Sequence, residues 1–434
     1  MTPLAIGAVG LIALFVLILA QVPIGFAMII VGVVGLALQT SWVPALTVLA
    51  TEPVSVLSNV DLATVPLFLL MGTFTTAAGL SSEIYNAVAA VWGHRRGGLA
   101  YATIGGSAAF GVMCGSSTAT AATFAKVALP EMLQRGYSPA FSTGTIAAGG
   151  TLKSLIPPSI VMVLYCIATQ TFIFDLFTAA VIPALIAIAL NLAAIAVVVR
   201  LTPKAAPVSP RIGWPERRLA LKRASPALVL IAGVFGGLYS GVFTVTEAAS
   251  VAAVLSFLFA LVRRRMTWTS FLAGLREAAS ATAMLYIILI GAFVFTYFIT
   301  AARIPEALVH LIDGLPLPPL AIVSLILLAY LVLGAVFDEI SAMLITLPFI
   351  LPVIVKLGYG ALWWGVLNVV VIELGMIIPP IGVIVFLLHG LAPNIPLWTI
   401  YRGVTPFIIA DLILLGLLTA FPGLSLWLPK LLAS

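Results

Sequence analysis

Charged side chains are scarce in this sequence. Its 434 residues include 20 Lys and Arg and 14 Asp and Glu, together 8%, whereas a soluble protein of ordinary composition has about 25%. This scarcity excludes an ordinary cytosolic enzyme and a disordered chain. It also excludes a typical nucleic-acid-binding protein, whose basic surface needs many more charges, so we expect no binding to nucleic acid.

Cysteine, histidine and catalytic motifs are also rare. Cys114 and Cys166 are the two cysteines, and both fall in apolar segments, where we expect packing residues rather than a disulfide. The three histidines are isolated, and the sequence has no HExxH, GxSxG or phosphate-binding loop motif. An intramembrane protease or an ATP-driven pump would lack its chemistry. We therefore expect no enzymatic activity and no cofactor.

Hydrophobic residues make up 62% of the chain. They form runs of about 20 residues, each long enough to cross a hydrocarbon core roughly 30 Å thick. The sequence therefore predicts an all-α polytopic protein that lies in a lipid bilayer. The apolar segments lie near 4–20, 23–40, 61–80, 98–114, 116–133, 138–170, 172–199, 225–240, 245–262, 283–300, 318–336, 341–356, 361–390 and 397–420.

The excess positive charge is concentrated in one loop near the middle. Segment 200–223 holds seven basic residues and one acidic residue, so its net charge equals the +6 of the whole chain. Basic loops remain in the cytoplasm, and we expect loop 200–224 to face it. The first basic residue is Arg95, so 4–20 is expected to be a first span rather than a cleaved signal. Both termini are then predicted to be periplasmic.

An internal repeat divides the chain into two halves. Its first copy, Leu129-Pro130, Gly136-Tyr137 and Ile156-Pro157-Pro158, recurs 222 residues later as Leu351-Pro352, Gly358-Tyr359 and Ile378-Pro379-Pro380. Two unrelated helices that both kink at Pro-Pro are the simpler alternative. Three motifs in the same order and spacing favour a true repeat, and broken helices in repeated halves are typical of secondary transporters.

Each half is predicted to contain five spans and one re-entrant hairpin, so that the second half is inverted relative to the first. The first repeat is 1–199, with hairpin 98–133 and an unwound helix within 138–170, unwound around 149–158. The linker is 200–224. The second repeat is 225–434, with hairpin 318–356 and unwound helix 361–390. Amphipathic segments 82–96, 267–280 and 303–314 are expected to lie along the membrane interfaces.

The first hairpin tip is rich in hydroxyl groups, over Cys114–Thr120. Hydroxyls and freed carbonyls at a helix break are the oxygen ligands that an alkali cation prefers, while a helix N-terminus favours an anion. A stripe of small residues that packs helices together is the alternative. Opposite the tip we expect the unwound stretch Gly149–Ser154. Lys153 in that stretch would bind an anionic substrate or pair with a carboxylate such as Glu373.

The second hairpin tip is acidic, over Phe337–Ser341, and is expected to face Glu373–Met376. Carboxylates at membrane depth are costly and usually functional. The alternative is a hydrated tip at which Asp338 and Glu339 cap the following helix.

At these residues the chain resembles the large membrane subunit of tripartite ATP-independent periplasmic (TRAP) transporters, and the resemblance covers essentially the whole chain. The motifs that carry it are Gly115-Ser116-Ser117 through Ala121-Ala122-Thr123, Leu129-Pro130-Glu131-Met132, Gly136-Tyr137, Ala147-Ala148-Gly149-Gly150-Thr151-Leu152, Leu155-Ile156-Pro157-Pro158-Ser159-Ile160, Thr246-Glu247-Ala248-Ala249, Gly375 with Pro379-Pro380, Arg402-Gly403-Val404-Thr405-Pro406-Phe407 and Leu426-Trp427-Leu428-Pro429.

The resemblance implies an elevator-type importer in the bacterial inner membrane, driven by a sodium gradient. Its substrate would be an organic acid, such as a C4-dicarboxylate, a sugar acid or a keto acid. A periplasmic substrate-binding protein would deliver the substrate, and a small membrane subunit would complete the complex. A single-component anion symporter or exchanger, and a membrane assembly subunit that does not transport, are the two alternatives.

The resemblance also implies which residues bind, with sodium ions as the coupling ions. Cations would bind at the two tips, with Ser116, Ser117, Gly149 and Thr151 at the first and Asp338, Ser341, Gly375 and Met376 at the second. The substrate would lie between the tips, near Thr118, Lys153, Pro157, Pro158, Pro379 and Pro380.

Overall fold

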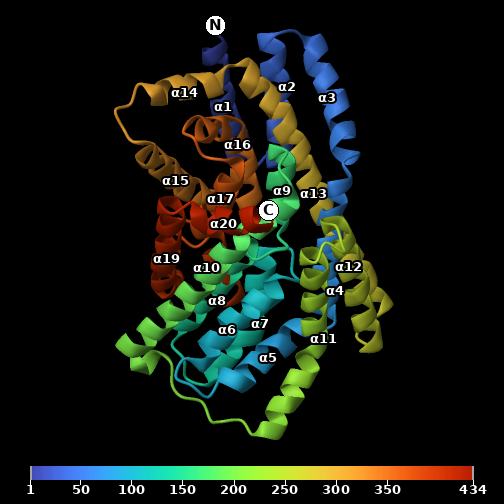
Figure 1. Ribbon diagram of the computed structural model, residues 1–434, viewed down its shortest axis with the longest axis vertical. Coiled ribbons are helices and arrows are strands. Elements are labelled where there is room, and N and C mark those ends of the chain that lie inside the picture. Colours follow the sequence, from blue (N-terminus) through green and yellow to red (C-terminus); the bar gives the residue numbers. More distant parts are fainter. Residues whose placement is uncertain (1, 433–434) are drawn as a thin grey trace.

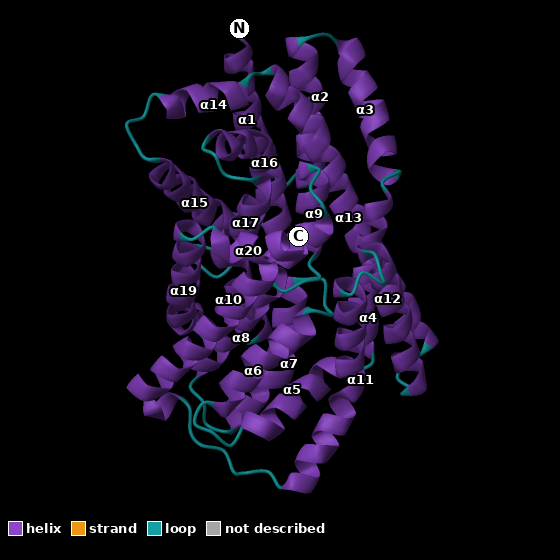
Figure 2. Cartoon of the chain, in the orientation of Figure 1, coloured by secondary structure: helices purple, strands orange, loops and turns teal. Residues whose placement is uncertain are grey.

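The computed structural model describes residues 2–432, and these residues form helices and loops without any strand (Figures 1 and 2). The all-helical architecture predicted from the sequence is confirmed. The first half contains α1 (Pro3–Leu19), α2 (Ile24–Gln39), α3 (Trp42–Leu57), the 3-10 helix η1 (Val60–Ala63), α4 (Thr64–Ala77), α5 (Leu80–Trp92), α6 (Gly98–Gly111), α7 (Ser117–Gln134), α8 (Pro139–Leu155), α9 (Ile160–Thr169) and α10 (Ile173–Leu201).

The second half follows a short connection. Within segment 200–224, the 3-10 helix η2 (Pro203–Ala205) precedes a loop, and α11 already begins at Trp214. The helices of this half are α11 (Trp214–Tyr239), α12 (Val245–Val262), α13 (Trp268–Ala301), α14 (Ile304–Asp313), α15 (Pro319–Val336), α16 (Glu339–Lys356), α17 (Ala361–Gly375), α18 (Val383–Leu391), α19 (Leu397–Ala420) and α20 (Gly423–Leu432).

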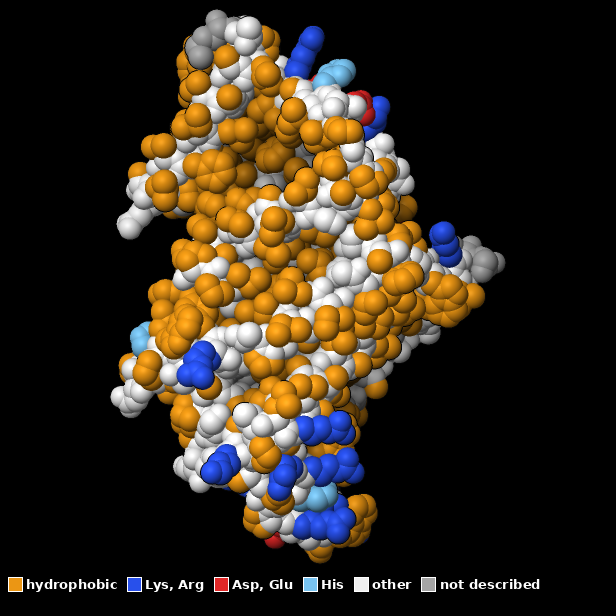
Figure 3. All heavy atoms as spheres, turned by 90° about the vertical axis from the view of Figure 1, so that its left-hand side faces the viewer, with side chains coloured by type: hydrophobic (Ala, Val, Ile, Leu, Met, Phe, Trp, Pro, Cys, Tyr) orange, Lys and Arg blue, Asp and Glu red, His pale blue; other side chains and the backbone are white. Residues whose placement is uncertain are grey.

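The surface has the distribution expected of a membrane protein. Nine helical segments among residues 2–432 are long and apolar enough to cross a bilayer. The face seen in Figure 3 is mostly apolar over its middle, and Lys and Arg side chains gather at its lower end. The central loop meets the base of the first hairpin at that end, where the Ser138 amide donates to the Ala205 carbonyl at 3.0 Å.

The two halves correspond helix by helix. The second helix of each hairpin begins at Ser117 in α7 and at Glu339 in α16, an offset of 222 residues. The helices α5 and α14 precede the two hairpins, and α8–α9 and α17–α18 follow them. Helices of the two halves also pack on each other: α2 packs on α13, and α12, which is the counterpart of α2, packs on α4. In Figure 1 the hairpin α6–α7 lies below the centre and α15–α16 above it, so the two tips approach each other.

One pair of counterparts differs in continuity. Helix α13 runs unbroken through Trp268–Ala301, whereas the corresponding part of the first half is divided into α3, η1 and α4. The segment 267–280, which is expected to lie along the interface, is therefore the first part of α13 rather than a separate element, and its position relative to the membrane stays a prediction. Residues 275–290 contain neither proline nor glycine, so nothing in the sequence interrupts helical hydrogen bonding there.

The two helix breaks lie close to the Pro-Pro motifs. Helix α8 remains helical to Leu155 and the chain restarts as α9 at Ile160, while the second break lies between α17 and α18. The prediction that the chain unwinds over 149–158 is therefore wrong for 149–155. Proline lacks the amide hydrogen that an α-helix needs, so the break falls at Pro157-Pro158 rather than at the glycines before it.

The glycines of α8 serve helix packing. A Cβ atom at Gly149 would lie 2.5 Å from the Ser107 hydroxyl of α6, and one at Gly150 would lie 2.9 Å from Cβ of Ala121 in α7. Helix α8 therefore fits into the groove between the two helices of the first hairpin. Small residues allow such close approach in membrane proteins, where packing rather than the hydrophobic effect joins helices.

On its other side α8 makes a backbone contact with α19. A Cβ atom at Gly403 in α19 would lie 1.8 Å from the Ala140 carbonyl oxygen, and one at Gly144 would lie 2.0 Å from the Gly403 carbonyl oxygen. These two glycines hold α8 and α19 closer than any side chain would allow.

We expect Gly403→Ala to lower the yield of folded protein several-fold, because the new methyl group must separate α8 from α19. Size-exclusion chromatography in detergent measures that yield. Gly416→Ala is the matched control, since Gly416 lies in the same helix and has open space around its Cβ position. Equal folded yields for the two variants would contradict the close α8–α19 contact.

Candidate functional site

The hairpin tips begin their second helices with equivalent N-caps. Ser116 Oγ accepts from the amide of Ala119 at 3.3 Å and contacts the Thr118 hydroxyl at 2.9 Å. Asp338 Oδ2 accepts from the Ser341 amide at 2.9 Å, and the Ser341 hydroxyl donates to Asp338 Oδ1 at 2.5 Å. Each cap satisfies amide groups that a helix N-terminus leaves free. Part of the oxygen-rich chemistry predicted for both tips is thus used to cap α7 and α16.

Directly after the caps, the two repeats touch each other. The Ser117 hydroxyl lies 3.3 Å from Glu339 Oε2, and these residues occupy the same position in the two repeats. Ser117 also donates to Glu373 Oε1 of α17 at 2.8 Å and lies 2.8 Å from the hydroxyl of Ser154 in α8. Ser154 donates to Glu339 Oε2 at 2.9 Å. We call Ser117, Ser154, Glu339 and Glu373 the tip cluster.

The tip cluster is deeply placed and short of positive charge. Ser117 and Ser154 have no exposed surface, Glu373 is 4% exposed, and Glu339 is partly buried. Two hydroxyl hydrogens serve four oxygen–oxygen contacts of 2.8 to 3.3 Å. Neither carboxylate forms an ion pair with any residue that the structure describes. Because buried carboxylates are stable only with a compensating charge, this arrangement suits a small cation or a proton.

Glu373 also lines a small void together with a second carboxylate residue, Asp411. The Oε2 atom of Glu373 has no hydrogen-bond partner among residues 2–432, and the void, which Thr151 also lines, has a volume of about 20 Å³. That volume is enough for one water-sized particle. Asp411 is itself 8% exposed and lies 3.3 Å from the amide nitrogen of Asn191.

Lys153 lies beside the first tip rather than in the tip cluster. Its side chain is fully buried, and Nζ donates to the Gly115 carbonyl oxygen at 2.9 Å. The expected alternative, an ion pair with Glu373, does not form. The lysine therefore joins α8 to the tip of the first hairpin.

The other predicted site residues are distributed around the breaks. Gly149 packs against α6, and the Thr151 hydroxyl donates to the Ala148 carbonyl at 3.0 Å within α8. Gly375 lies at the end of α17, and Met376 follows it and is buried. The first Pro-Pro motif, Pro157-Pro158, is buried, and the second, Pro379-Pro380, is exposed.

Sequence reasoning missed Ser154 as a site residue and left Glu339 and Glu373 outside the set of cation ligands. The repeat register contained part of the missing signal. Glu339 is the counterpart of Ser117, and Glu373 is the counterpart of Thr151. Ser117 and Thr151 were both predicted to be cation ligands. No comparable signal exists for Ser154, because its contacts depend on α8 remaining helical to Leu155.

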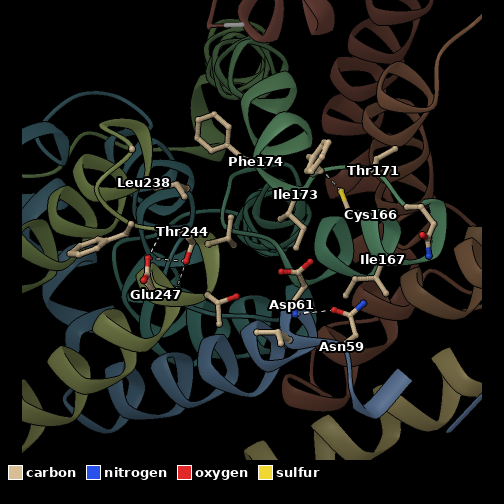
Figure 4. Close-up of a pocket in the computed structure, with 17 residues that line it drawn as sticks. Asn59, Asp61, Cys166, Ile167, Thr171, Ile173, Phe174, Leu238, Thr244 and Glu247 are labelled. Atoms are coloured by element: carbon tan, nitrogen blue, oxygen red, sulfur yellow. Dashed lines mark hydrogen bonds between the residues drawn. The ribbon is translucent and has the colours of Figure 1, made fainter. Parts of the chain in front are cut away.

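A large cavity of about 810 Å³ lies elsewhere, between η1, the α9–α10 connection and the α11–α12 connection (Figure 4). Asp61 and Glu247 help line it, and none of the seventeen lining residues that the structure describes is basic. Two carboxylates without a basic partner repel an anion. This cavity is therefore a poor candidate for binding an organic acid.

Comparison with known proteins identifies the family. The model of the tripartite ATP-independent periplasmic transporter, DctM component, matches residues 11–424. The C4-dicarboxylate TRAP transporter large permease protein DctM of Pseudomonas aeruginosa is 35% identical over 397 residues, covering 89% of this chain and 92% of that protein. The sialic acid TRAP transporter large permease protein SiaM of Vibrio cholerae is 30% identical over 417 residues, covering 96% of each chain.

The fold is also that of a solved transporter. The crystal structure of the YdaH transporter of Alcanivorax borkumensis matches with a TM-score of 0.59 and 15% sequence identity, over 89% of this chain and 90% of that chain. It supports the predicted fold class, an all-α membrane protein built from two inverted repeats. The family match and the sequence identities above establish the family: the chain belongs to the DctM family and is the large permease subunit of a TRAP transporter.

Proposed function

We propose that this large permease imports an organic acid together with sodium ions. A periplasmic binding protein delivers the acid, and a small membrane subunit completes the transporter in the bacterial inner membrane. The observation that carries the proposal is the tip cluster, in which oxygen atoms from both repeats converge with two carboxylates and two hydroxyl hydrogens.

The chemistry of the tip cluster supports a coupling cation. Carboxylate and hydroxyl oxygens are hard ligands, which suit alkali and other hard cations rather than soft metals. A sodium ion between Glu339 and Glu373 would offset their repulsion. It would also hold α7 and α8 of the first repeat to α16 and α17 of the second. Cation binding would thereby order both tips before the substrate binds.

Two observations support an organic acid as the substrate. Helix α7 begins at the first tip with a neutral serine cap and no acidic residue in its first turn, and the partial positive charge of a helix N-terminus favours a carboxylate. The similar proteins from Pseudomonas aeruginosa and Vibrio cholerae are named for a C4-dicarboxylate and for sialic acid. We place the acid between the tips, beside Thr118 and the exposed Pro379-Pro380 break.

An elevator movement fits the arrangement of the helices. The hairpins and broken helices form one body, and α2, α4, α12 and α13 form the frame beside it. Helices α5 and α14 connect the two, and each carries an ion pair at its edge, Glu83 with Arg263 and Asp313 with Lys356.

With the basic loop in the cytoplasm, both termini are periplasmic.

Ser154→Ala is expected to reduce sodium-driven uptake at least tenfold, because the Glu339 carboxylate loses a partly buried hydrogen bond, and such a bond to a charged group is worth about 1.5–3 kcal/mol. Uptake is measured in proteoliposomes that contain the large permease, its small subunit and its binding protein. Ser159→Ala is the matched control, since this buried hydroxyl of the same break has no partner in the described part of the chain. Equal uptake by the two variants would remove Ser154 from the site.

Sodium is expected to raise the thermal unfolding temperature of the purified permease, and Glu373→Gln should abolish that increase because it removes one of the two negative charges that attract the ion. A thermal-shift series in NaCl and in choline chloride at constant ionic strength measures the effect. Stabilisation that follows pH and ignores sodium would instead identify the tip cluster as a proton site.

Uptake is expected to require all three components. Omitting the binding protein from the proteoliposome assay should abolish uptake, because nothing would deliver the substrate to the tips. Full uptake by the large permease alone would support the single-component alternative. A complex that assembles normally but transports none of the acids tested, with or without sodium, would support the assembly-subunit alternative.

A further inference from the structure

Lys153 is a buried lysine that the tip cluster does not use. It is among the largest side chains with essentially no exposed surface, and no carboxylate that the structure describes forms an ion pair with it. Placing an ammonium group inside a membrane protein is costly and usually marks a functional position. The question is what this group does there.

The side chain crosses from α8 to the first tip along a prepared path. A Cβ atom at Gly111 would lie 3.0 Å from Cβ and Cγ of Lys153, so the glycine leaves room for the aliphatic part of the lysine. At the end of this path Nζ donates to the Gly115 carbonyl oxygen at 2.9 Å. This carbonyl lies in the turn between the end of α6 at Gly111 and the N-cap of α7 at Ser116, outside the hydrogen bonding of either helix.

The repeat shows what replaces this lysine at the second tip. The counterpart of Lys153 is Gly375, which has no side chain and packs against Gly334, where a Cβ atom would meet backbone at 2.6 Å. The second tip therefore has no ammonium group of its own. It has acidic groups instead, Asp338 and Glu339, with Glu373 on the adjacent helix.

Charge is thus distributed unequally between the two tips. One tip carries a positive charge on a fixed side chain that contacts a tip carbonyl. The other carries carboxylates that require a positive charge from outside. Both arrangements would produce the same result, which is a tip held to a broken helix by a cation that contacts a tip oxygen atom.

We propose that the ammonium group of Lys153 is a tethered cation, which does at the first tip what a free sodium ion does at the tip cluster. The transporter then takes up one fewer sodium ion in each cycle than it would with a sodium ion at both tips. Lys153 is a positioning residue and does not contact the substrate. The inference rests on the sodium coupling proposed above and specifies where that coupling resides.

The test compares Lys153→Ala, Lys153→Met and Lys153→Arg in proteoliposomes that contain all three components. Uptake is measured over a series of sodium concentrations, with the sodium-to-substrate ratio from ²²Na counting. The alanine variant leaves space beside Gly115 for an ion. It should lose uptake at low sodium, recover it at high sodium, and transport one additional sodium ion per substrate.

The other variants make the test specific. Methionine fills the space without a charge and should not recover at any sodium concentration, whereas arginine retains a tethered cation and should keep the wild-type ratio. Lys126→Met is the matched control, because Lys126 is an exposed lysine of α7, and it should leave the sodium dependence unchanged. Chromatography in detergent confirms that each variant is folded.

Three results would overturn the proposal. If Lys153→Ala raises the substrate concentration at half-maximal uptake without changing the sodium ratio, Lys153 binds the substrate. If the arginine variant, folded and active, has an altered sodium ratio, the charge on the tether is not what matters. If the alanine variant is folded and keeps the wild-type ratio at every sodium concentration, the lysine is structural. Sodium-independent uptake by the wild type is a separate outcome, since it would refute the proposed function itself.

Discussion

Helix ends that lie inside a membrane protein must find partners for their polar groups within the protein, because the surrounding lipid offers none. Four such ends meet here, at the starts of α7 and α16 and at the breaks after α8 and α17. Ser116 and Asp338 cap the starts of α7 and α16. Next to the first cap, Ser117 joins the two halves through its contacts to Ser154, Glu339 and Glu373. The rest of the structure positions the helices that bring these oxygen atoms together.

Close packing supplies that positioning. Helix α8 has the hairpin α6–α7 on one side and α19 on the other, and glycines on both sides bring the backbones together. With α8 fixed in this way, Lys153 and Ser154 emerge from its last turn at defined positions. Lys153 of this helix thus contacts the first tip, and the next residue, Ser154, contacts the second tip.

The sequence predicts the helical class, both hairpins and, as one of two alternatives, the acidic cap of the second tip, because these depend on local signals and on the repeat. It does not predict where α8 ends. From the sequence, Gly149 and Gly150 are interpreted as helix breakers. In the structure their small size allows close packing on α6 and α7, and the helix breaks only at the prolines. The partner of Lys153 was missed for the same reason, since the lysine was expected on an unwound chain rather than on a helix that directs it to Gly115. The continuity of α13 likewise depends on an absence of breakers that apolar runs alone do not reveal.

The contact between Ser117 and Glu339 joins two residues at the same position of the two repeats. Such a contact occurs near the axis that relates the halves. In an ancestor assembled from two separate copies of one half, the residue at this position would have faced its own duplicate, and any mutation would have changed both partners together. Two hydroxyls or two carboxylates could meet there, but never one of each. A single chain is free of that restriction, so its two repeats can place a hydroxyl and a carboxylate opposite each other, as Ser117 and Glu339 do.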